Sequence, residues 1–493
     1  MDTKRIFVLG NGFDLAHYLP TAYVHFMDAM MVVESWEEDQ ELGFDDLFQK
    51  YIAGECSDRD KGFFRNTKEL YKIDDLRLSI DTVKNLQTKL KNNGWFQHFK
   101  HHLTDVDTWI DFENEIENIL TSFSLIFDIE FSGSTVSDSI VGSYTNYSPD
   151  VDIRKVLDSD EQVFDWQLFK KFGVKVNYFL SLLNNFNVIK RIYGCAEYEL
   201  ESQRGRQSIY KNQVSKRLNK LEYDSFDVFE NKRIDEVTTR TTIKKSFENI
   251  VEIKYLNRLS TIYTSFNENE VFNKALKDLE VFSDIFTTYI SLVVNQLEPV
   301  EPFCAFGNLG QEIEALYTFN YSNTFEKLYP SSFNKEYNHV QYIHGSAERK
   351  NIVLGISDLD EYQLKKYKIY GFVKTFQKLI NNTDYKFLDN TDIKVVRSIP
   401  REAGQVRAHY EVVIWGHSLD ASDAEYIREI FSLNNESLLN RVNIRIWYHG
   451  SPHTQLANLM HIMGKDIIQE WMKKGWLVFE AAPDIYAENK KAE

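Results

Sequence analysis

The chain has 493 residues, a formal net charge of −17 and a pI of about 5.3. This length exceeds what one compact core usually organises, so we expect two lobes or one domain with a large insertion. Hydrophobic residues make up 43% of the chain, which argues against global disorder. The negative charge argues against bulk attraction to nucleic acid or to an anionic membrane, although a local basic patch is compatible with it.

The three cysteines, Cys56, Cys195 and Cys304, are far apart and form no CxxC pair. A disulfide framework or a cysteine zinc site is therefore not expected, and a reducing compartment fits. The apolar stretch around Phe286–Leu297 is too short to span a bilayer. We predict a cytoplasmic protein without membrane association.

The first predicted element is a buried strand at residues 5–9, followed by a glycine turn and a helix that begins near Thr21. From about residue 30 to 310 long stretches show the i, i+3, i+4 apolar spacing of amphipathic helices. These stretches are Asp60–Leu103, Thr108–Phe127, Asp165–Ile189 and Tyr255–Leu297. The Ser/Gly/Thr-rich residues 131–149 and the polar residues 222–244 are predicted to interrupt them as loops.

After residue 310, short apolar strands alternate with helices, which is typical of βαβ units and a mainly parallel sheet. The predicted strands lie near residues 314–319, 340–343, 352–355, 411–415, 442–448 and 477–480. We therefore predict a Rossmann-like α/β domain formed by residues 1–30 and 310–493. A mostly helical insertion, residues 31–309, would separate its first strand from the others.

A glycine turn follows the first strand, in the run Gly10-Asn11-Gly12-Phe13-Asp14. Glycines at this place allow backbone N–H groups to approach a pyrophosphate, and a following helix N-terminus favours an anion. The third glycine of the dinucleotide fingerprint is missing. A tight strand-to-helix turn with Asp14 as a helix cap is the alternative explanation.

Two further strands end in polar residues. Thr318-Phe319-Asn320 ends one of them, and an amide there can hold a ribose hydroxyl or a water, or can cap the next helix. His344-Gly345 ends the other. A neutral imidazole there can act as a base, with a glycine leaving room for a ligand, although a lone histidine is more often structural.

The strand near 411–415 leads into Gly416-His417-Ser418, which suits close contact with a phosphate or a ribose. Capping of the next helix by Ser418, Asp420 or Ser422 is the simpler role, and both roles can coexist. The carboxyl ends of parallel strands line the ligand crevice of an open α/β sheet. We therefore expect these strand ends to meet at one nucleotide site.

An acidic run, Asp111, Glu113 and Glu115, lies in one predicted helix. Paired acids can perform acid–base chemistry or hold a metal, but no histidine stands at metal-ligand spacing, and a solvated helix face is favoured. The basic stretch of residues 204–220 is also interpreted as a solvated helix, which is favoured over a nucleic-acid surface.

Taken in order, these motifs resemble the abortive-infection protein H (AbiH) family of bacterial anti-phage proteins. The resemblance covers both ends of the chain and one point of the insertion. It is carried by Gly10 to His17 with Leu19-Pro20-Thr21, Trp109 to Glu113, Phe319-Asn320-Tyr321, Ile343-His344-Gly345, and Gly416 to Leu419 with Asp423.

The α/β part also resembles a divergent sirtuin-type NAD-binding domain, whose Gly-Ala-Gly, Thr-Gln-Asn-Ile-Asp, His-Gly and Gly-Thr-Ser motifs occur in the same order. This resemblance implies that Asn320 and His344 act at the nicotinamide ribose. Ser322 stands where sirtuins have the aspartate that meets nicotinamide, and the four-cysteine zinc module is absent, which argues against a protein deacylase.

The function implied is an NAD glycohydrolase that depletes NAD, its substrate, to abort phage infection, with Asn320 and His344 catalytic and no metal. The expected nucleotide-binding residues are Gly10, Asn11, Gly12, Phe13, Asp14, Thr318, Gly345, Gly416, His417 and Ser418. A homo-oligomer and a phage-derived trigger are expected partners, and nucleic acid is not. The alternatives are a non-catalytic nucleotide-sensing module, or a metal-dependent nuclease that uses the acidic run and the basic stretch of the insertion.

Overall fold

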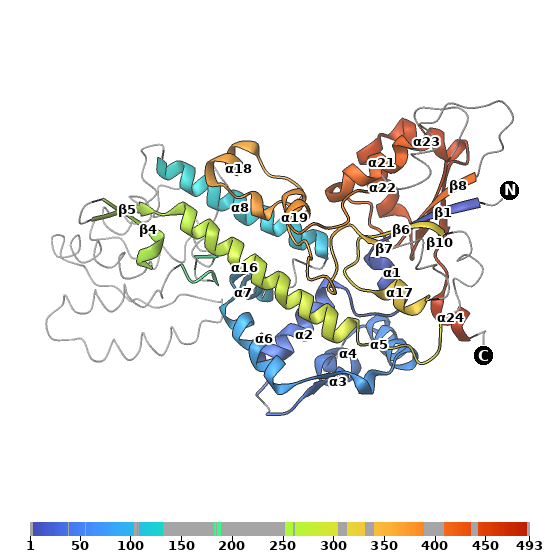
Figure 1. Cartoon of the computed structure of the whole chain (residues 1–493), viewed down its shortest axis with the longest axis horizontal. Helices are drawn as coiled ribbons and strands as arrows, with labels where there is room; N and C mark the ends of the chain where they lie inside the picture. The colour runs from blue at the N-terminus through green and yellow to red at the C-terminus, as the bar shows by residue number, and fades with distance from the viewer. Residues whose placement is uncertain are drawn as a thin grey trace.

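A computed structural model gives the fold of the chain (Figure 1). The structure describes residues 3–131, 182–188, 252–303, 313–330, 340–388, 409–434 and 442–490, apart from 38, 55, 103–105, 107, 184, 260 and 261. The predicted loops and helical pattern within 132–181 and 222–244, and the basic stretch at 204–220, lie outside the described residues. None of the described helices is both long and apolar enough to cross a membrane.

Six parallel strands form the central sheet, in the order β10-β9-β8-β1-β6-β7. They are β1 (Thr3–Leu9), β6 (Ile313–Thr318), β7 (Val340–Tyr342), β8 (His409–Trp415), β9 (Val442–Tyr448) and β10 (Leu477–Ala481). Counted along the chain, this is the 3-2-1-4-5-6 order of a doubly wound nucleotide-binding fold, and the order reverses between β1 and β8. The predicted Rossmann-like α/β fold is confirmed.

The register aligns the carboxyl ends of the strands. Leu9 pairs with Thr318 on one side and with Trp415 on the other, and Thr318 pairs with Tyr342. The residues that follow these positions therefore leave the sheet along one edge. This confirms that the four polar-tipped strands share a sheet and that their ends converge.

Both faces of the sheet are buried, which is why its strands are nearly continuous apolar runs. Ile6 and Val8 face one core, whereas Phe7 and Leu9 face the other. The first core is closed by α21 (Ala424–Ser432), α22 (His453–Met463) and α23 (Lys465–Lys473). The second is closed by α1 (Asn11–Ala16), α17 (Thr324–Leu328) and helices of the region between β1 and β6.

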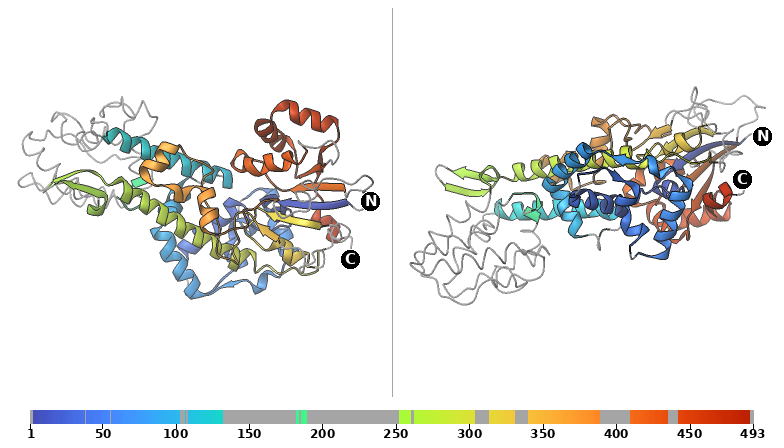
Figure 2. Two further views of the ribbon diagram at one scale, coloured as in Figure 1. Left: turned by 45° about the horizontal axis from the view of Figure 1, so that its top comes forward. Right: turned by 90° about the horizontal axis from the view of Figure 1, so that it is seen from below.

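Two long helices, α8 (Trp109–Phe131) and α16 (Glu268–Tyr289), run side by side from the sheet towards the far end of the molecule (Figures 1 and 2). Phe112 stacks on Phe282, and Trp109 packs on Phe286. A π-helical turn, η3 (Ile290–Val294), continues α16.

The remaining described elements are short. Before α8 they are α2 (Tyr23–Ser35), β2 (Leu42–Gly43), α3 (Phe44–Leu47), α4 (Gln49–Ile52), α5 (Asp58–Leu70), η1 (Ile73–Asp75), β3 (Arg77–Leu78), α6 (Ile80–Asn92) and α7 (Gly94–His101). After α8 they are η2 (Ile253–Tyr255), β4 (Leu256–Leu259), β5 (Ile262–Phe266), α18 (Glu361–Tyr367), η5 (Tyr370–Phe372), α19 (Lys374–Ile380), η6 (Ala421–Asp423) and α24 (Ile485–Lys490).

The helix expected near Thr21 is confirmed as α2, which begins at Tyr23, and the short helix α1 precedes it directly after Gly10. Two other details of the predicted elements are wrong. The apolar run at 352–355 forms no strand, because its backbone makes single hydrogen bonds, such as that from the Val353 N–H to the carbonyl of His344, and no ladder. The start of the helical stretch Tyr255–Leu297 is the hairpin β4–β5, rich in β-branched and aromatic residues.

The predicted helical stretch Asp60–Leu103 is divided into three helices, because polar side chains cap new helices within it. The Ser79 hydroxyl accepts a hydrogen bond from the Thr82 amide, which starts α6. The Asn93 side chain accepts one from the Phe96 amide, which starts α7.

Candidate functional site

A cavity of about 410 Å³ lies at the carboxyl edge of the sheet, over the point where the strand order reverses. We call it the first cavity. The loops after β1, β6, β7, β8 and β9 form one side, and α8, α16 and the start of α19 form the other. Residues of α8 and α16, from the helical region between β1 and β6, therefore form the cavity together with the loops of the sheet.

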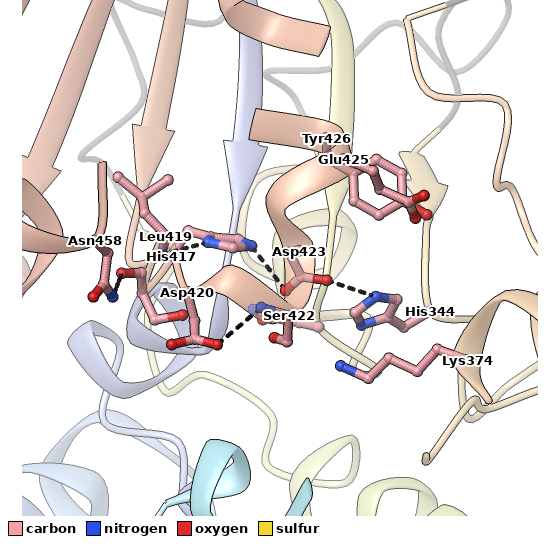
Figure 3. A network of polar contacts seen from close by, with 12 residues as sticks. His344, Lys374, His417, Leu419, Asp420, Ser422, Asp423, Glu425, Tyr426 and Asn458 are labelled. Atoms are coloured by element: carbon pink, nitrogen blue, oxygen red, sulfur yellow. Dashed lines mark hydrogen bonds and ion pairs between the residues drawn. The ribbon is translucent and has the colours of Figure 1, made fainter. Parts of the chain in front are cut away.

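An aspartate between two imidazoles occupies one wall of the first cavity (Figure 3). One carboxylate oxygen of Asp423, Oδ1, lies 3.3 Å from Nε2 of His344, and the other, Oδ2, lies 3.6 Å from Nε2 of His417. The Leu419 amide donates to Nδ1 of His417 over 2.9 Å, so a neutral His417 carries its proton on Nε2, facing Asp423. Phe319 packs edge-on against both imidazoles.

Burial sets the charges of this group. It lowers the pKa of His344 to about 4 and also lowers the pKa of His417, so both imidazoles are neutral at pH 7. Burial opposes ionisation of Asp423 as well, but the nearby ammonium of Lys374, together with His344 and His417, holds the pKa of Asp423 well below its usual range. The group is thus an ionised carboxylate placed between two neutral imidazoles.

Lys374 is the buried cation of the first cavity. It begins α19, and its side chain is 4% exposed. Its Nζ lies 2.5 Å from Oε1 of Glu113, which comes from α8. Burial opposes the charge on Lys374, but the carboxylates of Glu113 and Asp423 raise its pKa, so it is protonated at neutral pH. The ion pair joins the helical region to the sheet at the cavity.

A second carboxylate, Asp14, lies in the first turn of α1 and is 1% exposed. The amide nitrogen of Asn320 donates to its Oδ1 over 2.9 Å, and the hydroxyl of Ser322 donates to its Oδ2. Burial raises the pKa of Asp14 to about 6, against these hydrogen bonds. The amide oxygen of Asn320 is buried and has no partner among the described residues, so it can accept a hydrogen bond from a ligand.

The glycines allow the loops after β1 and β8 to touch. Gly12 donates its N–H to the carbonyl of Gly416 over 2.8 Å, and Gly10 donates to Trp415 over 3.0 Å. A Cβ on Gly12 would lie 2.7 Å from Cα of Gly416, whose φ is +71°. Loop packing therefore accounts for these glycines, and it uses the Gly12 N–H that a phosphate would need.

The structure brings most of the predicted binding residues to the first cavity, namely Gly10, Asn11, Gly12, Asp14, Asn320, His344, Gly416, His417 and Ser418. Three others lie elsewhere. Phe13 packs in the core against Trp415, and Gly345 turns with a φ of +78°. Thr318 is buried behind the site, where its hydroxyl accepts a hydrogen bond from the backbone N–H of Asn320.

The alternative capping roles are distributed differently. Asp14 makes no cap hydrogen bond, and Asn320 does not cap α17, which begins after Asn323. Asp420 is the residue that caps η6, by accepting from the Ser422 amide over 2.9 Å. Asp420 therefore fixes the turn that carries Asp423 into the cavity.

The prediction of a solvated acidic face is wrong for Glu113, which lines the first cavity. The acidic run diverges: Asp111 accepts from Thr108, Glu113 pairs with Lys374, and Glu115 contacts His98. In the described part of the chain, no group of three His, Cys, Asp or Glu side chains is arranged as metal ligands.

Sequence reasoning missed Lys374, and it did not assign Asp423 and Glu113 to the site. Both acids stand in runs that carry the family resemblance, and this signal could have found them. Nothing in the sequence around Lys374 marks it. Gln455 of α22 was also missed, and it reaches the site by donating to the carbonyl of His417 over 2.7 Å.

Residues 6–444 match the protein family described as Bacteriophage abortive infection AbiH. The chain belongs to the AbiH family. No curated protein and no solved structure matches this AbiH protein. Membership of the family implies a role in abortive infection against phage.

The five motifs that carry the family resemblance are spread from Gly10 to Asp423, yet each contributes to the first cavity of this AbiH protein. The contributing residues are Gly10 and Asp14, Trp109 and Glu113, Asn320 and Tyr321, His344, and His417 and Asp423. The cavity is therefore the place where the features recognised in the sequence meet.

Proposed function

We propose that the first cavity binds NAD and hydrolyses its nicotinamide N-glycosidic bond, and that loss of NAD is how this AbiH protein aborts phage infection. The observation that carries the proposal is the convergence of the five motifs at the switch point of a 3-2-1-4-5-6 sheet. Ligands of open α/β sheets bind at this point, and the dinucleotide-binding fold has this strand order.

The proposed reaction needs a polar group at the ribose and a base for water. Asn320 has an unpartnered amide oxygen, which would accept a hydrogen bond from a ribose hydroxyl or from the water. His344 would take the proton of that water, and the adjacent carboxylate of Asp423 would stabilise the imidazolium that forms.

The chemical balance is that of glycosyl transfer to water. The water oxygen forms a bond to C1′ as the bond from C1′ to the nicotinamide nitrogen breaks. The electron pair of the broken bond neutralises the pyridinium charge of nicotinamide, and the proton of the water passes to His344. The products are nicotinamide, ADP-ribose and one proton.

Negative charge near C1′ favours an oxocarbenium-like transition state, and Asp14 would supply it. In the resemblance to sirtuins, the aspartate that meets nicotinamide corresponds to Ser322. Ser322 donates its hydroxyl to Asp14, so a carboxylate from α1 lies next to that position. This arrangement supports a related use of the site with the acid supplied from another element.

The test measures nicotinamide release by the purified chain, and NAD in cells with and without phage. His344→Ala and Asn320→Ala should each remove most activity, and the double variant should lose little more, because the residues act as a unit. His453→Ala and Asn92→Ala are matched controls, since both residues are exposed and do not line the first cavity.

Protein levels and urea midpoints establish that each variant is folded. Infected cells that are protected by the wild-type chain while their NAD stays constant would contradict the proposal. Binding of NAD without turnover in infected-cell extracts would also contradict it, and would favour a nucleotide-sensing module instead.

A further inference from the structure

A second cavity, of about 370 Å³, lies behind the wall that carries Asp423. We call it the second cavity. It is enclosed by α19, by the first turns of η6 and α21, and by the end of α22. Its lining residues are Ser357, Asp358, Lys374, Thr375, Lys378, Ala421, Ser422, Ala424, Glu425, Arg428, His461 and Ile462.

The second cavity has more cations than anions. Lys374, Lys378 and Arg428 line it, against the carboxylates of Asp358 and Glu425, in a protein whose net charge is −17. Because Lys374 is already paired with Glu113, the cations left for a ligand are Lys378 and Arg428, and such groups in a strongly acidic protein favour an anion locally.

The cations are arranged at two depths. The Lys378 side chain is 5% exposed and donates to the Tyr426 hydroxyl over 2.6 Å, with Oε1 of Glu425 at 3.3 Å. An ammonium has three N–H donors, so one remains for a ligand. Arg428 and His461 lie at the exposed rim, and neither forms an ion pair within the described residues.

The two cavities share part of their lining. Lys374 and Ser422 line both of them, and Asp423 follows Ser422 directly. Among the groups that lower the pKa of Asp423, Lys374 has the largest effect. A charge placed in the second cavity therefore acts on the aspartate–histidine group through Lys374, which lines both cavities.

We infer that the second cavity binds the phosphate group of a small molecule, held by Lys378 and Arg428, and that this anion activates the first cavity through Lys374. Guanidinium and ammonium groups with hydroxyls from Ser357 and Thr375 are the donors that phosphate oxygens use in proteins. The N-terminal turn of α21 adds a favourable dipole.

The direction of the effect follows from the charges. The phosphate adds negative potential behind Lys374 and offsets part of its effect on Asp423 and His344. His344 then binds a proton more tightly and becomes a stronger base, whereas in the absence of the anion burial keeps its pKa near 4. This activating role rests on the proposed function, whereas phosphate binding does not.

The binding test is calorimetric titration of the full-length chain with inorganic pyrophosphate and, separately, with AMP. Arg428→Ala should weaken binding of both by about tenfold, and adding His461→Ala should weaken it further. Arg59→Ala, an exposed arginine on α5, and Asn320→Ala, in the first cavity, should leave binding unchanged.

The outcomes separate the two cavities. No heat with either anion, or equal affinity in Arg428→Ala and the wild-type chain, would overturn the inference. Binding abolished by Asn320→Ala would place the anion in the first cavity and would overturn it too. Equal affinities for pyrophosphate and AMP assign recognition to the phosphate alone, whereas tighter AMP binding assigns part of it to the nucleoside.

The activating role is tested by nicotinamide release with and without AMP, in the wild-type chain and in Arg428→Ala. An increase in nicotinamide release on addition of AMP, in the wild-type chain but not in Arg428→Ala, supports the activating role. Anion binding that depends on Arg428, with no NAD hydrolysis under any condition, leaves the phosphate site established and refutes the proposed function instead.

Discussion

The substitution Asp14→Asn should stabilise the protein at neutral and basic pH. Asp14 is 1% exposed, and its burial raises its pKa from the ordinary 3.8 to about 6. A carboxyl group with a raised pKa binds its proton more tightly in the folded state. Its contribution to stability is therefore fully present below pH 3.8 and is lost as the pH rises through about 6.

The size of the effect follows from the same two pKa values. A rise in the pKa of Asp14 from 3.8 in the unfolded state to about 6 in the folded state lowers the free energy of unfolding by about 3 kcal/mol at a pH above both pKa values, relative to a pH below both. About half of this, roughly 1.4 kcal/mol, falls between pH 5 and pH 8. An asparagine at position 14 keeps an oxygen that can accept from Asn320, and the Ser322 hydroxyl can reverse to accept from its amide.

The assay is urea unfolding of the wild-type chain and Asp14→Asn at pH 5 and pH 8, followed by tryptophan fluorescence. The gain of the variant over the wild type should be larger at pH 8, and taking this difference cancels the histidine contributions that the two proteins share. Asp45→Asn, at an exposed carboxylate paired with Lys68, is the control and should show no such gain.

Two results would refute this reasoning about Asp14. One is a difference between the variant and the wild type that is equal at pH 5 and pH 8. The other is a variant that is less stable at pH 8 than at pH 5, relative to the wild type. If Asp14 also serves catalysis as proposed, the stabilised variant should lose phage protection, since functional groups are often kept at the expense of stability.

Two further substitutions test how the site is built. Gly12→Ala should lower the free energy of unfolding, measured by urea unfolding, because its Cβ would lie 2.7 Å from Cα of Gly416. Gly62→Ala in α5, where a Cβ would have nothing within 4 Å, should raise the free energy of unfolding by about 0.5–1 kcal/mol. Equal effects of the two substitutions would contradict the close loop contact. Lys374→Met should cost about 3–5 kcal/mol because it leaves buried carboxylates unpaired, and adding Glu113→Gln should recover part of this loss in the same urea assay. A double variant as unstable as Lys374→Met alone would show that the two side chains are not coupled.

The sequence by itself determined the strands of the sheet and where their polar ends lie. The run at 412–415 is apolar throughout, as a strand buried on both faces must be, and it lies in β8; the run at 442–448, where Asn443 and Arg445 alternate with apolar residues, forms β9. Because a glycine, an amide or an imidazole follows each of four such runs, the location of the first cavity at their carboxyl ends could be predicted.

Local sequence was a poorer guide to the burial of the helices. Periodicity identifies which residues share a face of a helix, but not which face is buried. Lys374 and Lys378 are one turn apart on α19, a pattern typical of a solvated face. The structure buries both lysines and leaves Leu379 and Ile380 exposed at 55% and 69%.

Only the tertiary structure decided which charges meet. Glu113, Lys374 and Asp423 are far apart in the chain, and no spacing rule relates them, because each is placed by the packing of a different element. The same holds for Asp14, whose carboxylate accepts hydrogen bonds from the side chains of Asn320 and Ser322, which lie 306 and 308 residues later in the chain. Local sequence specifies backbone conformation, but the burial that shifts pKa values and pairs charges arises only when the sheet and the helices close around the cavity.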